Sequence, residues 1–211
     1  MRIAFVSAFL AFILSLASAS AATSPALDQF AKAWSALNGY TADIQLYEVK
    51  SPRDVATGNN VEHAVFAYTY RKPQSVTMHV NQGPNAGATV TWTGGSTVRA
   101  SKSGAFGITM SKNVSLKDPL VTSLRGYTVS DLSLPGILAH AQQTPGSSYS
   151  GSTTVNGGTV TAVTLNVANP SQDNGMTREV LYLSQSTQLP VRIDGFVGNQ
   201  LVRTYSFAIA K

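Results

Sequence analysis

From Tyr40 onward, apolar side chains alternate with polar ones in one short stretch after another. Phe66, Tyr68 and Tyr70 share one parity in the first long stretch, and Met78 and Val80 do so in the next. A period of two residues is that of a β-strand with one buried face, whereas a helix repeats every 3.6 residues. The alternation therefore predicts half-buried antiparallel strands over most of the chain.

Compact turn signals separate these stretches. Gly94-Gly95, Asn156-Gly157-Gly158 and Gly198-Asn199 are typical of tight β-hairpins. Counting the stretches between such signals predicts about eleven strands, the last ones covering about 160–167, 180–183, 191–197 and 201–209. No repeat or low-complexity linker divides them, so a single domain is expected.

Two regions depart from the alternation. Ser24 and Pro25 begin a predicted helix over 25–37, which Asn38-Gly39 ends, and its apolar stripe is Leu27, Phe30, Ala31, Trp34 and Leu37. Residues 116–143 predict two short helices or turns inserted between two blocks of sheet. The expected fold is mainly β (α+β): an incomplete antiparallel β-barrel with an N-terminal amphipathic helix and a central helical lid.

The first 21 residues have the pattern of a cleavable secretory signal peptide. Arg2 precedes the apolar run Ile3–Leu16, and small residues follow it. Cleavage is expected after Ala19-Ser20-Ala21, with Ala17-Ser18-Ala19 as the alternative site. The apolar run is shorter than the roughly 20 residues of a spanning helix, so an uncleaved anchor is the less favoured alternative. The expected mature domain is 22–211.

Composition narrows the possible partners. The chain has no cysteine, which excludes disulfides, thiolate metal sites and an acylated lipid anchor. The net charge is +5, but only 12% of residues are charged and no basic cluster exceeds two residues. A nucleic-acid partner is therefore not expected. We expect an exported, soluble, unanchored protein that is a monomer.

The sequence carries no recognisable catalytic motif. It lacks a Gly-x-Ser-x-Gly elbow, a phosphate loop and a dinucleotide fingerprint, so no cofactor is expected. His63, His79 and His140 are far apart, which predicts no metal site, and the dispersed strand acids are expected to be solvated. The chain is not expected to be an enzyme, although buried acids or histidines that converge in space would favour one.

The apolar strand faces are the most informative feature for function. Curved into an incomplete barrel, they would give an adaptable concave pocket rich in aromatic residues and methionine. The alternative is that the same residues pack against the N-terminal helix as a filled core.

Local motifs and their order resemble a known family. The motifs are Tyr70-Arg71-Lys72-Pro73 before Val76-Thr77-Met78, Trp92–Gly95, and Thr187-Gln188-Leu189-Pro190-Val191 before Phe196–Asn199. With the export signal, helix, strand meander, lid and closing strands, they resemble the LolA/LolB-like periplasmic carriers, including LppX-like mycobacterial lipoproteins. The resemblance spans nearly the whole mature chain and implies a LolA-like half-barrel over 22–211.

The resemblance also implies a function and a site. It implies a periplasmic carrier or sensor that binds a lipid, an acyl chain or a lipoprotein without catalysis, with transient membrane or membrane-protein contact. The sequence does not closely match the dedicated lipoprotein chaperones, so delivery of lipoproteins to an outer membrane is not implied. The implied lid residues are Leu120, Leu124, Ile137 and Leu138, and the implied floor residues are Phe66, Tyr68, Tyr70, Met78, Val80, Trp92, Phe106, Ile108 and Met110. Arg71, Lys72 or Arg125 would meet an anionic head group. The alternative function is a protein-interaction module that uses the same face or an edge strand.

Overall fold

One antiparallel sheet of eleven strands forms the body of the protein. The computed structural model describes residues 24–104, 109–144 and 146–210, so the expected signal peptide, Phe106 and Ile108 lie outside the described residues. The strands are β1 (Gly39–Val49), β2 (Val61–Arg71), β3 (Ser75–Gln82), β4 (Ala88–Trp92), β5 (Thr97–Ser103), β6 (Thr109–Ser115), β7 (Ser148–Val155), β8 (Gly158–Asn166), β9 (Arg178–Ser184), β10 (Pro190–Val197) and β11 (Gln200–Ala210).

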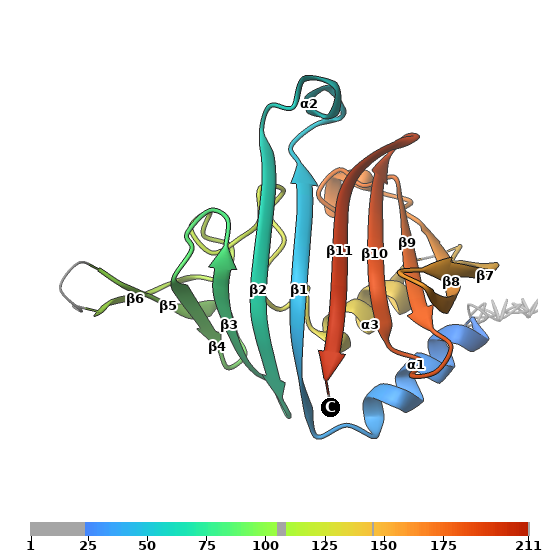
Figure 1. Ribbon diagram of the computed structural model, residues 1–211, viewed down its shortest axis with the longest axis horizontal. Helices are drawn as coiled ribbons and strands as arrows, with labels where there is room; N and C mark the ends of the chain where they lie inside the picture. The colour runs from blue at the N-terminus through green and yellow to red at the C-terminus, as the bar shows by residue number, and fades with distance from the viewer. Residues whose placement is uncertain (1–23, 105–108, 145, 211) are drawn as a thin grey trace, which may run out of the picture.

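The strand order explains why the barrel stays open. It runs β6-β5-β4-β3-β2-β1-β11-β10-β9-β8-β7, so the first and last strands pair at the centre (Figure 1). Strands β6 and β7 lie at opposite edges and do not meet. The predicted fold, a mainly β incomplete barrel of about eleven strands, is confirmed.

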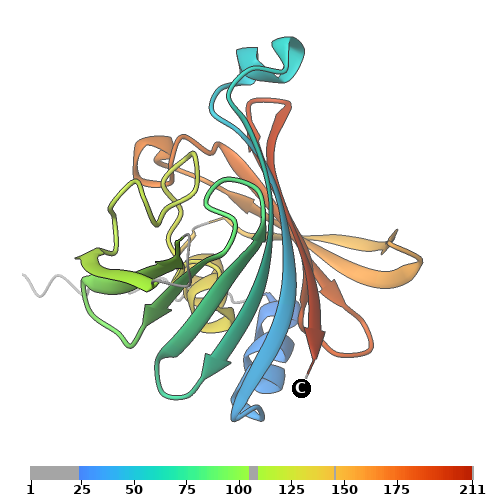
Figure 2. The same cartoon turned by 60° about the vertical axis from the view of Figure 1, so that its left-hand side comes forward.

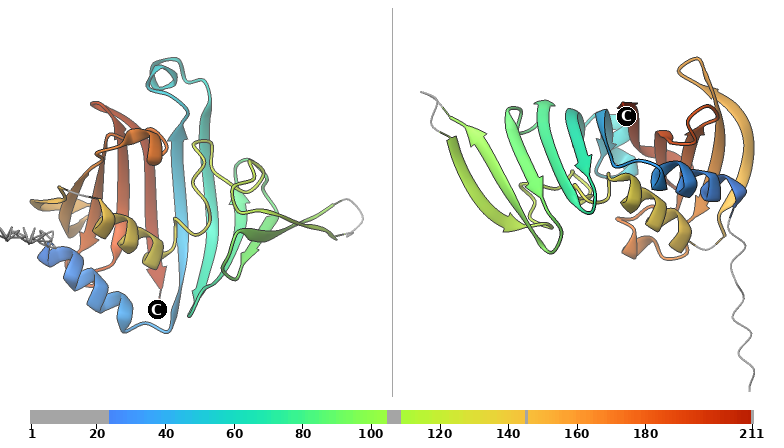
Figure 3. Two further views of the ribbon diagram at one scale, coloured as in Figure 1. Left: turned by 180° about the vertical axis from the view of Figure 1, so that it is seen from behind. Right: turned by 90° about the horizontal axis from the view of Figure 1, so that it is seen from below.

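Two helices cover one face of the curved sheet. The helices α1 (Pro25–Ser35) and α3 (Leu134–Gln143) lie side by side on this face, as Figures 2 and 3 show. Leu27 and Phe30 of α1 and Leu134 and Ile137 of α3 are buried against the sheet. We call this face the concave face. Within the described residues, no helix is long and apolar enough to cross a membrane.

The segment 116–144, here called the lid, runs from edge strand β6 across the concave face toward edge strand β7 (Figure 3). Its first part, 116–133, consists of turns, and its second part is α3. The sequence pattern allowed either a short helix or turns over 116–124, and the structure has turns there. Leu120 donates its backbone N–H to Asp118 Oδ1 at 2.9 Å, a local contact that competes with helix formation.

Two short helices were not expected from the sequence. Helix α2 (Pro52–Thr57) connects β1 to β2, and the 3-10 helix η2 (Pro170–Gln172) lies between β8 and β9. Ser51 donates its hydroxyl to Asp54 Oδ2 at 2.6 Å at the start of α2.

Aromatic side chains fill the concave face beside α1. The Tyr40 and Tyr70 rings stack with centroids 5.6 Å apart, and the Trp34 ring meets Tyr70 edge-on at 5.3 Å. The Tyr68 hydroxyl donates to the Val129 carbonyl at 3.0 Å, which fixes the lid to β2. This part of the face is thus a packed core, and the remaining space lies elsewhere under the lid.

Candidate functional site

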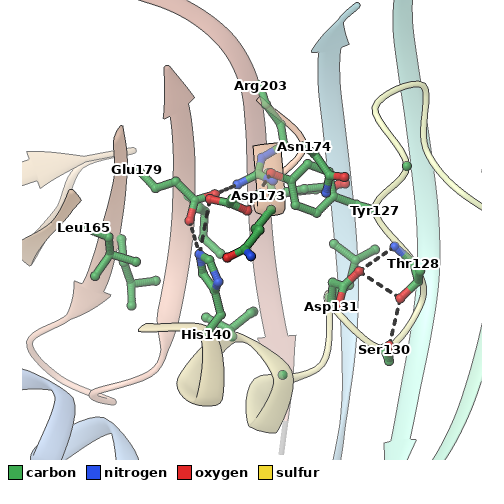
Figure 4. Close-up of a pocket in the computed structure, with 18 of the residues that line it drawn as sticks. Tyr127, Thr128, Ser130, Asp131, His140, Leu165, Asp173, Asn174, Glu179 and Arg203 are labelled. Carbon is green, nitrogen blue, oxygen red and sulfur yellow. Dashed lines mark hydrogen bonds and ion pairs between the residues drawn. The ribbon is translucent and has the colours of Figure 1, made fainter. Parts of the chain in front are cut away.

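A cavity of about 360 Å³ lies between the lid and strands β8 to β11 (Figure 4). Its walls combine apolar side chains with an unusual group of charged ones. The lining residues are Leu116, Lys117, Gly126, Tyr127, Thr128, Ser130, Asp131, Leu132, Gly136, Ile137, His140, Leu165, Gln172, Asp173, Asn174, Glu179, Leu181, Ile193, Arg203 and Tyr205.

Strand register places the charged residues in one row across the concave face. Glu179 of β9 pairs with Gly195 of β10, Gly195 pairs with Arg203 of β11, and Arg203 pairs with Glu48 of β1. The next partner in the row is Glu62 of β2. Gly195 gives the row space, because a Cβ there would lie 2.8 Å from Met176 Sδ and 3.3 Å from Arg203 Nε.

Glu179 and Arg203 form a buried ion pair in this row. Their side chains are 2% and 3% exposed, and Arg203 Nη2 donates to Glu179 Oε1. Burial alone would raise the pKa of the Glu179 carboxyl, but the charge of Arg203 and the hydrogen bond from His140 outweigh it and lower the pKa. The Arg203 guanidinium also lies over the Tyr127 ring, 3.9 Å from its centroid.

His140 brings the lid helix into contact with this pair. Its Nε2 lies 2.5 Å from Glu179 Oε2 and 3.7 Å from Asp173 Oδ2. The hydrogen bond to Glu179 raises the pKa of the imidazole despite partial burial. Burial, together with the charge of Glu179, raises the pKa of Asp173. The Tyr127 hydroxyl donates to Asp173 Oδ1 at 3.4 Å, and Figure 4 shows these side chains converging.

An apolar wall of the cavity lies beside the charged residues, since Leu181 belongs to the same strand as Glu179. Leu165 of β8, Leu181 of β9 and Ile193 of β10 come from the sheet, and Leu132 and Ile137 come from the lid. Leu165 and Leu181 are at most 2% exposed. A site with one apolar wall and one charged wall suits an amphipathic molecule.

A second, smaller cavity of about 60 Å³ lies between the lid and the strand meander. Phe66, Met78, Val80 and Leu120, all predicted ligand contacts, line it. Both cavities share the walls Tyr127, Thr128, Leu132 and Tyr205. The lid loop, residues 120–132, therefore separates two parts of one concave face.

Acidic side chains of the sheet hold this loop in place. Glu48 Oε2 accepts the backbone N–H of Arg125 at 2.8 Å, and Glu62 Oε2 accepts that of Leu124 at 2.8 Å. The Arg125 guanidinium donates to the carbonyls of Val49, Lys50 and Asn174. The loop is thus fixed by hydrogen bonds to the sheet rather than by regular secondary structure.

The other predicted ligand contacts are dispersed. Ile137 lines the larger cavity, whereas Tyr68, Tyr70, Trp92 and Leu138 are buried in the core.

Met110 and Leu124 lie outside the two cavity walls. Met110 is 70% exposed near the end of the β5–β6 hairpin, and Leu124 is half-buried in the lid loop.

The predicted head-group residues are also separated. Arg71 and Lys72 are exposed at the end of β2, where Lys72 Nζ donates to the Ser35 carbonyl at 2.9 Å. Arg125 lies nearest to the larger cavity, because it contacts Asn174 in the cavity wall.

The charged wall corrects two expectations. Glu48 and Glu179 are buried rather than solvated, and His140 has close carboxylate partners. The alternation along the strands already indicates these buried positions. Glu48 follows Ile44 and Leu46 at the positions of its strand that face the core. Glu179 precedes Leu181, and Arg203 precedes Tyr205, in the same way. His63 and His79 are exposed.

Comparison with known proteins supports the fold. No protein-family model and no curated protein matches the sequence. Among solved structures, an uncharacterized conserved protein from Thermus thermophilus superposes with a TM-score of 0.54 at 9% identity, covering 88% of this chain and 85% of that one. The two chains therefore share a fold.

Two further solved structures match at lower TM-scores. A LolA superfamily protein from Nitrosomonas europaea matches with a TM-score of 0.37 at 7% identity, over 88% of this chain and 90% of that one. The lipoprotein LppX from Mycobacterium tuberculosis matches with a TM-score of 0.41 at 12% identity, over 90% and 96%. Both likenesses concern the fold alone, and with TM-scores below 0.5 neither bears on the site.

Proposed function

We propose that this protein is an exported, non-catalytic carrier or sensor that binds the acyl part of a lipid or lipoprotein beneath its lid. In this proposal it works as a freely diffusing monomer in the periplasm and meets a membrane or a membrane protein transiently. Its residues 1–21 are the proposed signal peptide. No organic cofactor and no nucleic acid takes part.

The observation that carries the proposal is the cavity between the lid and the sheet. Its volume of about 360 Å³ lies within the roughly 300–1,000 Å³ of small-molecule sites. At ~30 Å³ for each water-sized group, it accommodates about twelve such groups. Burying about twelve methylenes would contribute roughly 10 kcal/mol before ordering and association costs.

A longer acyl chain needs the second cavity as well. Movement of the lid loop would join the two cavities, because the loop forms their common wall. The meander floor would then become accessible to the ligand. The proposed contacts are the members of the predicted set that line the two cavities, Phe66, Met78, Val80, Leu120 and Ile137, to which the geometry adds Leu165, Leu181 and Ile193.

The charged wall is the proposed place for the polar end of the ligand. His140 is accessible from solvent, since 41% of its side chain is exposed, and it lies at the edge of the apolar wall. Arg125 stays a candidate for head-group contact beside it. Arg71 and Lys72 lie at another part of the sheet and would serve only a ligand that extends along the meander.

Native mass spectrometry and lipid extraction of protein purified from the periplasm test this function. We expect a co-purifying apolar ligand at close to one per chain, and displacement of a fluorescent hydrophobic probe by fatty acids. Ile137→Trp fills the cavity and should reduce probe binding at least tenfold. His79→Trp, which adds the same ring on an exposed face of β3, should leave it unchanged.

Two results would contradict the proposal. One is protein that carries no apolar ligand and binds no hydrophobic probe. The other is equal probe binding by the Ile137→Trp and His79→Trp variants. One stoichiometric protein partner without lipid would favour the protein-interaction module instead.

The convergence of His140, Glu179 and Asp173 favours an enzyme as a second candidate function. A histidine hydrogen-bonded to a carboxylate beside a cavity is an arrangement that general acid–base catalysis uses. Incubating the purified protein with its extracted ligand separates the two functions. A carrier returns the ligand intact, whereas an enzyme produces a changed ligand at a rate that His140→Gln abolishes.

A further inference from the structure

The two carboxylates beside His140 are oriented in the same way. Glu179 receives Arg203 on Oε1, and its Oε2 faces His140. Asp173 receives Tyr127 on Oδ1, and its Oδ2 faces His140. Each carboxylate thus has one oxygen held by an outer donor and the other directed at a common point. Outer donors of this kind orient the ligands of protein metal sites.

The three inward atoms are close enough for one ion. Ligand atoms of His140, Asp173 and Glu179 all lie within 4.8 Å of one another. Ligands at about 2.1 Å from a tetrahedral zinc ion are separated by about 3.4 Å. The observed separations of 2.5 and 3.7 Å from His140 Nε2 bracket that distance. A shift of His140 Nε2 away from Glu179 and toward Asp173 would bring both of its separations close to that distance.

One of the inward atoms is an unsatisfied acceptor. Asp173 Oδ2 is buried and has no hydrogen-bond partner among the described residues. Such an atom is costly unless a donor or a cation reaches it. A cation at the point that the inward oxygens face would satisfy this atom.

We propose that His140, Asp173 and Glu179 bind a divalent transition-metal ion, with zinc as the reference metal. One imidazole and two carboxylates form a donor set that suits zinc and its first-row neighbours. The remaining coordination positions face the cavity, where a water molecule or an oxygen of a bound molecule fits. Since His140 is partly exposed, the ion reaches the site from solvent.

Isothermal titration of chelator-treated, tag-free protein with zinc chloride tests the site. We expect one zinc ion per chain. His140→Gln and Asp173→Asn, which remove one ligand each, should weaken zinc binding at least tenfold. The matched controls His79→Gln and Asp43→Asn change an exposed histidine and an exposed aspartate of the sheet and should bind zinc as the wild type does.

Histidine NMR of the wild-type protein gives a second readout that needs no variant. Zinc should shift the side-chain ¹⁵N resonances of His140 and leave those of His63 and His79 in place. This readout, together with His140→Gln, decides the question even if Asp173→Asn does not fold. The proposal is overturned if zinc does not bind at about 1 mM, or if both ligand variants bind it with wild-type affinity. Neither result depends on whether the protein carries a lipid.

Discussion

Glu179→Gln tests the charged row across the sheet most sharply. The substitution keeps the size of the side chain but removes the charge that faces Arg203. Both side chains are at most 3% exposed, so the guanidinium is left buried without its closest anion. Breaking one side of a buried ion pair costs about 3–5 kcal/mol.

The surroundings of Arg203 place the expected loss at the lower end of that range. The Tyr127 ring at 3.9 Å and the Tyr205 ring at 5.2 Å still contact the guanidinium. Glu48 remains its cross-strand neighbour. We therefore expect the free energy of unfolding to fall by about 3 kcal/mol, which lowers the Tm by roughly 6–12 °C for a domain of this size.

Urea denaturation followed by circular dichroism, in buffer with a chelator, measures this loss. Asp43→Asn removes an exposed carboxylate from β1 and should stay within about 0.5 kcal/mol of the wild type. The double variant Glu179→Gln/Arg203→Met should recover part of the loss, because it removes the buried guanidinium that Glu179→Gln leaves without its closest anion. A single Glu179→Gln variant as stable as Asp43→Asn would refute the reasoning.

Two further substitutions test the packing and the titration of the same row. Gly195→Ala should lower the free energy of unfolding by about 1–3 kcal/mol, since its Cβ would lie 2.8 Å from Met176 Sδ. The control Gly158→Ala places its Cβ no closer than 3.6 Å to any atom, so thermal unfolding should show a much smaller loss. Burial raises the pKa of Glu48 above 4.5, so the folded protein holds this proton more tightly than the unfolded chain does. The free energy of unfolding of the wild type, relative to that of Glu48→Gln, should therefore fall as the pH rises from about 4.5 through the raised pKa. Denaturation curves between about pH 4 and 8 measure this difference in free energy. A difference that stays constant or rises with pH would contradict the expectation.

The architecture could be predicted because its signals are local. Alternation of polar and apolar residues identified the strands, and Ser24-Pro25 marked the start of α1. In α3, Ser133 Oγ accepts the Gly136 N–H at 3.0 Å and caps the helix, whereas the Ser24 side chain makes no such bond at the start of α1. Ser51 and Asp54 are a comparable local start signal for α2. That helix has only six residues, so its sequence pattern is short.

The site could not be predicted in the same way because it depends on register between distant strands. Glu179 and Arg203 meet only because β10 aligns both with Gly195. That alignment includes an irregularity at Gly195 and Phe196, which no spacing in the sequence specifies. His140 reaches Glu179 through the course of the lid, a turn-rich segment whose path is set by contacts with the sheet.

Exposure at the sheet edge could not be read from parity either. Met110 has the parity of the buried Val114, but β6 is an edge strand with exposed neighbours, and only Val114 is buried within it. Parity identifies which residues share a face. It does not show how far along a strand the covering lid extends.

A crystal structure of the protein saturated with a fatty acid brominated on its chain would test the central claim most directly. The bromine atoms give an anomalous signal that locates the chain without ambiguity. The account predicts the signal inside the cavity between α3 and strands β8 to β10, beside Leu165, Leu181 and Ile193. Bromine only on the outer face of the sheet, or none in a crystal grown at saturating fatty acid, would contradict it.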